Sequence, residues 1–267
     1  MVAPILRDRH SSGRIRDVRM FTIGLIWIPA VLWCDRTASP TGQLALGVLT
    51  WALLLALLWR EATAVRVQVA VVVAFATLVE YAFSAGLGVY IYRLDHVPPY
   101  VPPGHGLVYL AALTMARSSV LRQHARLAVT ATVTLAVSYA LWGLFLAPRP
   151  DALGAFWCLC LVAFLIWGKS RLLYVGAFVV VTYLELLGTA WGVWAWQTHD
   201  PTGLVTIGNP PSVAAGGYGW FDLAAVAATP WLLGQWERWR ARWPERGLAE
   251  GQLGHDAVVQ VGVGGEG

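Results

Sequence analysis

Charged side chains are scarce in this chain: Asp, Glu, Lys and Arg make up 13% of its 267 residues, whereas apolar residues make up 57%. Soluble domains carry about 25% charged residues, so this composition excludes an ordinary soluble protein and predicts an all-α, polytopic membrane protein. Eight apolar stretches are long enough to cross a bilayer if some tilt is allowed. They lie near residues 20–34, 43–59, 67–92, 105–121, 127–147, 153–168, 172–197 and 212–235.

Cysteine is also rare, with three residues in the whole chain. Cys158 and Cys160 are two positions apart, which places their side chains about 200° apart on a helix and prevents them from binding one metal ion together. The sequence lacks a phosphate-binding Walker loop and the Gly-x-Ser-x-Gly turn of serine hydrolases. These absences exclude the familiar zinc, redox and serine-hydrolase patterns.

Three histidines fall in or beside predicted loops on one side of the membrane, namely His96, His105 and His199. Asp95 and Asp200 are adjacent to two of them, and imidazole with carboxylate is a donor set that suits several divalent ions. No His-x-x-x-His or His-x-x-Glu spacing occurs, however, and the sequence leaves open whether any of the three binds a metal. We predict neither a bound metal nor a cofactor.

Basic residues are distributed unevenly among the predicted loops. If the N-terminus is cytoplasmic, sixteen Lys and Arg residues lie on the cytoplasmic side and only three, Arg36, Arg93 and Arg149, on the other. This positive-inside bias predicts a multi-pass protein of the cell membrane with both termini in the cytoplasm. The basic residues are spread over five short segments, so the net charge of +4 reports orientation, and we predict no nucleic-acid partner.

The predicted organisation has three parts. Residues 1–19 form a cytoplasmic segment without the apolar core of a signal peptide, residues 20–235 form the membrane domain, and residues 236–267 form a cytoplasmic, mostly disordered tail. Tryptophan alternates with arginine where the tail begins, which is typical of an anchor at the inner membrane interface. These residues are Trp236, Arg238, Trp239, Arg240, Arg242 and Trp243.

One sequence pattern occurs twice, about a hundred residues apart. In each copy a Glu is followed by spaced small residues and two aromatic residues, a Pro-containing loop and an apolar stretch. The aligned segments are Ser84-x-x-x-Gly88-Val-Tyr90-x-Tyr92 with Gly188-x-x-x-Gly192-Val-Trp194-x-Trp196, and Leu110-Ala-Ala-Leu with Leu223-Ala-Ala-Val. The alignment requires one slipped residue at the Glu. We predict a 4+4 internal repeat, with halves at 20–121 and 127–235 related by an axis along the membrane normal.

Three carboxyl groups lie inside predicted helices: Glu80, Glu185 and Asp222, the last aligned with Tyr109 of the first copy. Glu80 precedes Tyr92 by twelve residues, so on a continuous helix it lies roughly 17 Å deeper, near the bilayer midplane. No Lys or Arg lies at that depth. Because an apolar medium disfavours the charged carboxylate, we expect at least one of the three acids to be neutral at pH 7 and able to donate or carry a proton.

Aromatic residues end both motif helices. Tyr90, Tyr92, Trp194 and Trp196 lie where an outer aromatic belt is expected. We predict that these four residues also line a substrate pocket. His105, which begins a helix directly after a Pro-Pro-Gly segment, is the fifth predicted pocket residue.

The second copy, Glu185-x-x-Gly188-Thr189-x-x-Gly192-x-Trp194-x-Trp196, resembles the polytopic carotenoid-biosynthesis family that includes the carotenoid hydratases. Members of that family carry a Glu, spaced glycines and an aromatic pair at the end of a helix, and tryptophans replace the usual aromatics here. The resemblance covers about a dozen of the 267 residues. Membrane-bound terpene cyclases are similar in another respect, since they pair a Glu on an early helix with an Asp on the last helix. Both resemblances imply an isoprenoid substrate.

These observations favour a membrane-embedded enzyme that modifies an isoprenoid or carotenoid-like lipid by acid–base chemistry, such as hydration, cyclisation or isomerisation. Asp222 or Glu185 is the predicted general acid, Glu80 its partner, and Tyr109 helps to shape the pocket, because a dry aromatic site favours a developing carbocation. One alternative is a small proton-coupled transporter that uses the same acids as proton carriers. Another is a non-catalytic membrane assembly protein. The predicted partners are the bilayer and a lipid substrate, and the sequence does not determine the oligomeric state.

Overall fold

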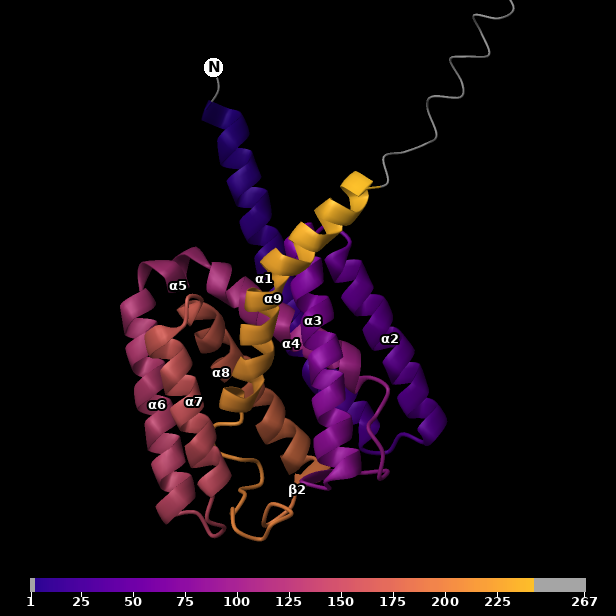
Figure 1. Cartoon of the computed structure of the whole chain (residues 1–267), viewed down its shortest axis with the longest axis vertical. Coiled ribbons are helices and arrows are strands. Elements are labelled where there is room, and N and C mark those ends of the chain that lie inside the picture. The colour runs from indigo at the N-terminus through magenta and orange to yellow at the C-terminus, as the bar shows by residue number, and fades with distance from the viewer. Residues whose placement is uncertain (1–2, 243–267) are drawn as a thin grey trace, which may run out of the picture.

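The structure is a computed structural model that describes residues 3–242 as a bundle of helices with one short pair of strands (Figure 1). The first half of the chain forms α1 (Ala3–Asp35), α2 (Pro40–Leu58), α3 (Thr63–Glu80), the π-helical turn η1 (Tyr81–Gly86), β1 (Tyr90–Tyr92) and α4 (Val101–Arg117). The second forms α5 (Ser119–Gln123), α6 (Ala125–Phe145), α7 (Ala152–Trp167), α8 (Arg171–Ala190), β2 (Trp194–Trp196) and α9 (Ala215–Arg242).

Within the described residues, five helical segments are long and apolar enough to cross a membrane. They are Ile15–Asp35 of α1, α2, the continuous segment Thr63–Gly86, α6 and α8, while α7 is apolar but shorter. The outside of the bundle is itself apolar, as on α2, where Leu44, Val48 and Leu55 are exposed. The fold is therefore helical, as predicted, and compatible with a multi-pass membrane protein.

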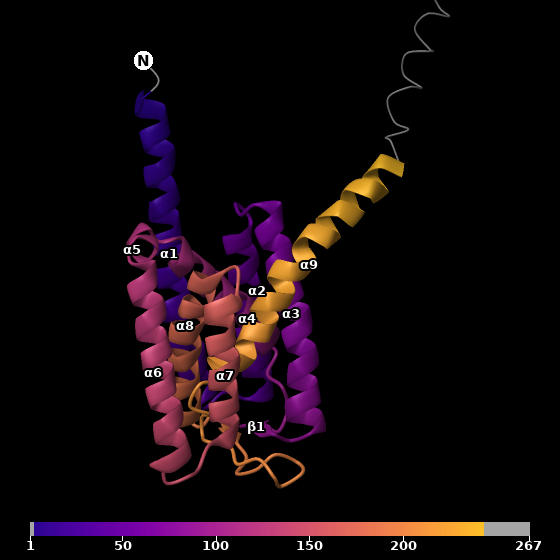
Figure 2. The same cartoon turned by 60° about the vertical axis from the view of Figure 1, so that its left-hand side comes forward.

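The two ends of the bundle differ. The strands and the long loops lie at one end, which we call the strand end, whereas the N-terminus and the last turns of α9 lie at the other, which we call the termini end (Figures 1 and 2). The helices α4 and α8 carry the most buried residues and pack against each other in the centre. On either side of this pair, α1 and α3 pack against α4, and α9 packs against α3, α7 and α8.

Both motif helices end earlier than predicted. The stretches 67–92 and 172–197 are not continuous helices, because the chain leaves the helix after Gly86 and Ala190 and then forms β1 and β2. Gly88 and Gly192 adopt φ values of +62° and +68°, the left-handed region that favours glycine. These two glycines reverse the chain direction, so the predicted depth of about 17 Å between Tyr92 and Glu80 along one helix is wrong.

The two strands pair with each other across the repeat. They are antiparallel, with Ile91 opposite Ala195 at the centre and Tyr90 and Tyr92 opposite Trp196 and Trp194. The two copies of the motif align with a shift of 104 residues, so Tyr90 is equivalent to Trp194 and Tyr92 to Trp196. Exchanging equivalent residues converts the pair Tyr90–Trp196 into the pair Tyr92–Trp194 and leaves the central pair unchanged. The flanking hydrogen bonds obey the same relation, since Arg93 N–H donates to the Val193 carbonyl and Gln197 N–H to the Val89 carbonyl.

The π-helical turn accounts for the slipped residue in the alignment. Glu80 lies twelve residues before Tyr92, whereas Glu185 lies eleven before Trp196. In the first copy Val89 N–H donates to the carbonyl of Phe83, six residues back, and in the second Val193 N–H donates to that of Gly188, five residues back. A π-helical turn adds about one residue to an α-helix, so η1 absorbs the extra residue and the two glutamates reach comparable positions.

Buried carboxylates fix the loops at the strand end. Asp35, at the end of α1, accepts hydrogen bonds from Gln43 Nε2 and Tyr100 Oη and pairs with Arg93. In the second half, Asp151 accepts backbone N–H groups from the 208–212 loop and from the first turn of α7. Each loop is therefore tied to the helices beside it, which positions the residues that follow.

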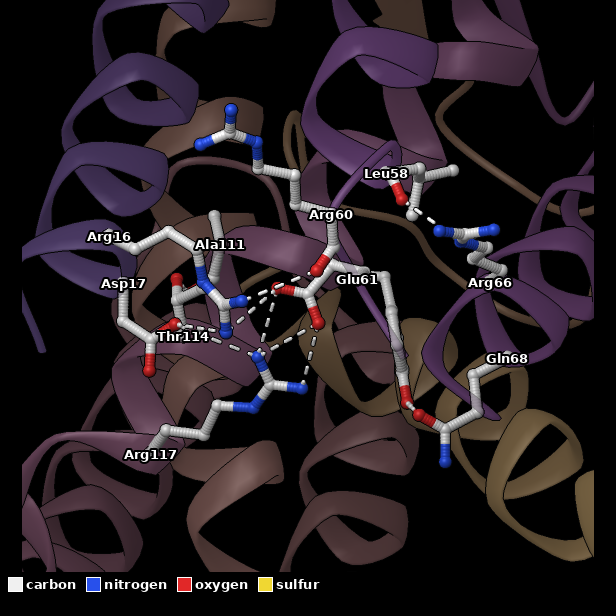
Figure 3. Close-up of polar contacts among 11 residues, drawn as sticks. Arg16, Asp17, Leu58, Arg60, Glu61, Arg66, Gln68, Ala111, Thr114 and Arg117 are labelled. Carbon is white, nitrogen blue, oxygen red and sulfur yellow. Dashed lines mark hydrogen bonds and ion pairs between the residues drawn. The ribbon is translucent and has the colours of Figure 1, made fainter. Parts of the chain in front are cut away.

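A charged cluster closes the termini end. Glu61, which is buried in the turn between α2 and α3, pairs with Arg16 of α1 and Arg117 of α4, both at 3.3 Å, and Asp17 lies beside both arginines (Figure 3). The cluster holds three segments of the first half together at this end.

The terminal helices are longer than predicted. The first helix begins at Ala3, so it includes most of the predicted segment 1–19, and α9 extends past residue 235 to Arg242. Residues 236–242, which we predicted to form an interfacial anchor at the start of the tail, are helical. The rest of that tail lies outside the described residues. Trp236 stacks on Trp239 at 5.2 Å between ring centroids, and the Arg240 guanidinium lies over the Trp236 ring.

Candidate acid site in an apolar cavity

Glu80 lies at the end of α3 with its carboxylate turned into the bundle, where the residue is 6% exposed. The chain reversal at Gly88 brings β1 back over this carboxylate. Oε2 accepts hydrogen bonds from Tyr92 Oη at 2.7 Å and Tyr90 Oη at 2.9 Å, and Oε1 lies 2.9 Å from His105 Nε2. Three neighbouring polar groups thus replace the water that the carboxylate loses on burial.

Glu185 on α8 has an equivalent environment and is 4% exposed. Its Oε2 accepts hydrogen bonds from the indole N–H groups of Trp194 at 3.0 Å and Trp196 at 3.1 Å. Its Oε1 has only a longer contact of 3.5 Å with Tyr218 Oη. Gly188 permits this arrangement, because a Cβ at that position would overlap the ring of Trp194.

The two acids share one aromatic enclosure. The rings of Tyr90 and Trp196 lie 4.5 Å apart between centroids, and those of Tyr92 and Trp194 lie 6.1 Å apart. His105 contacts Glu80 and Tyr218 contacts Glu185, and the centroids of these two rings lie 5.2 Å apart. The strand pairing therefore joins two half-sites into one.

A single large cavity opens onto both acids. Its volume is about 630 Å³, and its wall is largely apolar, with Glu80, Glu185 and His105 among its few ionisable groups. The cavity extends from Ile28 on α1 to Trp157 on α7. Cavities of about 300–1,000 Å³ are typical of small-molecule sites. Four large apolar side chains of its wall, Phe75, Phe83, Leu87 and Trp220, are also exposed.

No protein-family model, curated protein or solved structure matches this chain.

Asp222 and Tyr109 do not line the large cavity. Both lie deeper in the bundle and line a second, much smaller cavity, which they share with His105 and Tyr218. Asp222 is 5% exposed, and its Oδ2 has no hydrogen-bond partner among the described residues. Tyr109 Oη donates to Gln68 Oε1 at 3.0 Å. The repeat alignment that pairs Asp222 with Tyr109 thus places two residues at the same cavity, but not at the proposed acid site.

The aromatic residues are placed differently from the prediction. Tyr90, Tyr92 and Trp194 are buried and contact the acids, and Trp196 is partly buried, so these residues do not form an outer belt. The reason is the chain reversal after each motif helix, which periodicity alone does not reveal. Their predicted role as pocket residues agrees with their position, since all four line the large cavity together with His105.

The other histidines lie away from the site. His96 and His199 are exposed in loops, where their Nδ1 atoms contact the Leu94 carbonyl and the Thr198 hydroxyl. Asp200 is also in a loop but lines the large cavity, and hydrogen bonds from Thr202 and from backbone N–H groups hold the pKa of its carboxyl below the usual range. Among the described residues, no group of three or more His, Cys, Asp or Glu side chains is arranged to hold a metal ion.

Tyr218 is the site residue that the sequence analysis missed. It lies five residues before Leu223, as His105 lies five residues before Leu110. Extending the repeat alignment back from the Leu-Ala-Ala segments therefore pairs Tyr218 with His105. Each of the two contacts the Oε1 atom of its own glutamate.

Proposed function

We propose that this protein is a membrane-embedded enzyme that modifies an isoprenoid or carotenoid-like lipid by protonating a carbon–carbon double bond. One observation carries the proposal: two buried glutamates face one large, aromatic-lined cavity within helices that are apolar enough to cross a membrane. A long apolar lipid fits the wall of this cavity. Hydration, cyclisation and isomerisation all begin with the same protonation step.

The membrane arrangement that we propose has eight crossings, made by α1, α2, α3, α4, α6, α7, α8 and α9. The termini end lies in the cytoplasm of a cell-membrane protein, and the loops that follow the strands, 93–100 and 197–214, lie outside. The positions of the basic residues support this orientation, because Arg16, Arg60 and Arg117 lie at the termini end and only three basic residues fall in the predicted outer segments.

We also propose that the two halves form a 4+4 repeat. The self-consistent register of β1 and β2 supports it, as does the packing of the four motif helices. A two-fold axis would exchange α3 with α8 and α4 with α9. The contact between α3 and α9 would then correspond to the contact between α8 and α4, and both of these contacts are extensive. Such an axis runs along the membrane normal.

Hydrogen-bonding capacity assigns different roles to the two glutamates. Indole N–H groups can only donate, so Glu185 Oε2 must accept from Trp194 and Trp196, and a proton on this carboxyl group must be on Oε1. Oε1 has the weaker contact, which leaves its proton available to a ligand. Glu80 has close partners on both oxygens, because two tyrosine hydroxyls donate to Oε2 and His105 Nε2 lies 2.9 Å from Oε1. Glu185 is therefore the proposed acid and Glu80 the proposed base.

Glu185 Oε1 transfers its proton to one alkene carbon, where the π electron pair forms the new C–H bond, and a carbocation is left on the other carbon. The ring faces of Tyr90, Tyr92 and the two tryptophans stabilise this cation. Loss of a proton from a neighbouring carbon to Glu80 completes an isomerisation. Prior attack by a second double bond gives cyclisation, and attack by water gives hydration.

Expression in a host that supplies isoprenoid and carotenoid precursors tests the proposal. Lipid extracts are compared by mass spectrometry for the wild type, Glu185→Gln, Glu80→Gln and the matched control Asp95→Asn, whose side chain is exposed in a loop. Wild type and Asp95→Asn should produce a new isomer or hydrated lipid. Loss of a general acid or base typically costs about 10²–10⁴ in rate, so both glutamine variants should lose at least 99% of the product at equal membrane levels.

Other outcomes contradict the proposal. Glutamine variants that fail to accumulate would mark the acids as structural, as expected of an assembly protein. A wild-type protein that changes no lipid, but moves protons into vesicles when a solute gradient is applied, would be a transporter.

A further inference from the structure

The small cavity lies directly behind the acid site. Its volume is about 10 Å³, and its polar lining groups are His105, Tyr109, Tyr218 and Asp222. His105 and Tyr218 also line the large cavity, so these two side chains stand between the cavities. Each of them contacts a glutamate on its other side.

Asp222 is the unexplained group of this cavity. It is 95% buried, and no described side chain or backbone group hydrogen-bonds to its Oδ2. A buried carboxyl group without a hydrogen-bond partner destabilises the fold, so it needs a polar companion. About 10–15 Å³ is enough for one water molecule, which needs two to four polar partners. The four polar side chains around the cavity supply that number.

The proposed reaction requires a path for protons between the two glutamates, and the small cavity lies where such a path is needed. Hydration, cyclisation and isomerisation each consume a proton from Glu185 and release one to Glu80. The net charge of the protein is unchanged, but after one turnover the proton is on Glu80 and Glu185 has none. A second turnover therefore requires a path from Glu80 back to Glu185. His105 is hydrogen-bonded to the first glutamate and Tyr218 contacts the second, and the small cavity is where the two come together with Asp222.

We propose that Asp222 and one internal water molecule return the proton from Glu80 to Glu185. This inference rests on the proposed function and adds the step that resets the site. His105 Nε2 takes the proton from Glu80 while its Nδ1–H proton passes through the water to the Asp222 carboxylate. Asp222 then passes a proton through the water to the Tyr218 oxygen, as the Tyr218 hydroxyl proton moves to Glu185 Oε1. Each transfer breaks one bond to hydrogen and forms another, and no external acid is needed. His105 ends with its proton on Nε2, so a rotation of the neutral ring, in which Nε2–H gives its proton to the water and Nδ1 accepts one from it, restores the starting tautomer before the next turnover.

Tyr109 positions the water in this scheme. Its hydroxyl proton is donated to Gln68, so its oxygen remains free to accept a hydrogen bond from the water. Asp222 does not line the large cavity. Its role is to carry a proton between two other groups, which distinguishes it from the predicted role as general acid.

Two measurements test the inference. The first uses infrared spectra of the full chain in phosphatidylcholine vesicles, without substrate. Asp222→Asn should remove one carboxyl-group band, and in the wild type this band should shift after transfer to D2O. Tyr109→Phe should shift the same band, because it changes the hydrogen bonding of the shared water. A band that D2O and Tyr109→Phe both leave unchanged would overturn the water link.

The second measurement separates proton return from proton donation. In the lipid-conversion assay, Asp222→Asn should still form up to one product per protein molecule, and later turnovers should slow by at least 100-fold, the lower range for losing a proton-transfer group. Asp222→Glu should restore part of the later rate, whereas Glu185→Gln should form no first product. Loss of the first turnover in Asp222→Asn, or an unchanged later rate, would overturn the inference. A wild-type protein that converts no lipid contradicts the proposed function instead, and the spectra still test the link among Asp222, Tyr109 and water.

Discussion

Asp35 shows how strongly one residue can control the site from a distance. It is fully buried at the end of α1 and is the common partner of Gln43, Arg93 and Tyr100. Arg93 directly follows β1, so the ion pair fixes the strand that carries both tyrosines of the acid site. The second half uses a different solution, in which Asp151 binds backbone N–H groups of the 208–212 loop.

The Asp35→Asn substitution should lower the stability by about 1–3 kcal/mol, the usual cost of leaving a buried donor without its acceptor, because Arg93 is partly exposed and also donates to the Ala38 carbonyl. Arg93 would then lack its counter-charge, and at least one of the donors around Asp35 would lose its acceptor. The measurement is the unfolding free energy in detergent micelles. Asp95→Asn is the control, because Asp95 is exposed and asparagine tolerates its φ of +58°. Equal stability of the two variants would contradict the prediction.

At the scale of the elements, Gly88 and Gly192 decide where the motif helices end. Gly88→Ala should destabilise the protein by about 1–2 kcal/mol, because alanine resists the left-handed conformation. The cost is conformational, since a Cβ at Gly88 would meet nothing within 4 Å. Gly104→Ala is the matched control: this glycine also has open space but lies inside α4, so alanine should stabilise it by about 0.5–1 kcal/mol. Opposite signs in thermal-melting experiments support the interpretation, and equal signs contradict it.

The turn η1 gives a second test among the elements. Because it holds one extra residue, deletion of the exposed Ala82 should convert it to an α-helix and leave Glu80 eleven residues before the last strand residue, as in the second copy. Deletion of the exposed Leu186 in α8 removes a residue that no bulge can absorb and rotates Glu185 by about 100°. Membrane accumulation and melting temperature should stay near wild type for the first deletion and fall for the second. Similar damage from both would show that η1 is not an insertion.

The sequence reveals the helices and the acidic residues inside them but not which side chains contact those acids. Apolar runs locate the helices, and the repeat locates Glu80 and Glu185, because a carboxyl group in an apolar stretch is conspicuous. The glycine-driven reversals were not predictable, since Gly88 in an apolar run fits a helix-packing position equally well. The partners of the acids therefore remained hidden. Asp222 looked equivalent to the glutamates in depth, and only the packing of α9 shows that it faces a different cavity.

At the scale of the whole molecule, the proposed orientation leads to a labelling experiment. The exposed Cys34 is first replaced by serine, and single cysteines are then placed at Asp95, Asp200 or Arg122. The first two positions lie in the loops at the strand end, and the third lies in α5 (Figure 1). A membrane-impermeant maleimide should label the first two in intact cells and the third only after the membrane is opened. Labelling of Arg122→Cys alone in intact cells would invert the topology.

The exposed side of the large cavity determines which concentration of the substrate sets the occupancy of the site. Phe83, Leu87 and Trp220 line the cavity and are exposed, so we assign this side of the cavity to the lipid. A ligand that enters there comes from the bilayer, so its mole fraction among the lipids, and not its molarity in the sample, sets the occupancy. Adding inert phospholipid at a fixed amount of substrate should slow the reaction in proportion to the dilution, whereas adding buffer should change nothing. The protein would then obey the two-dimensional kinetics of surface dilution.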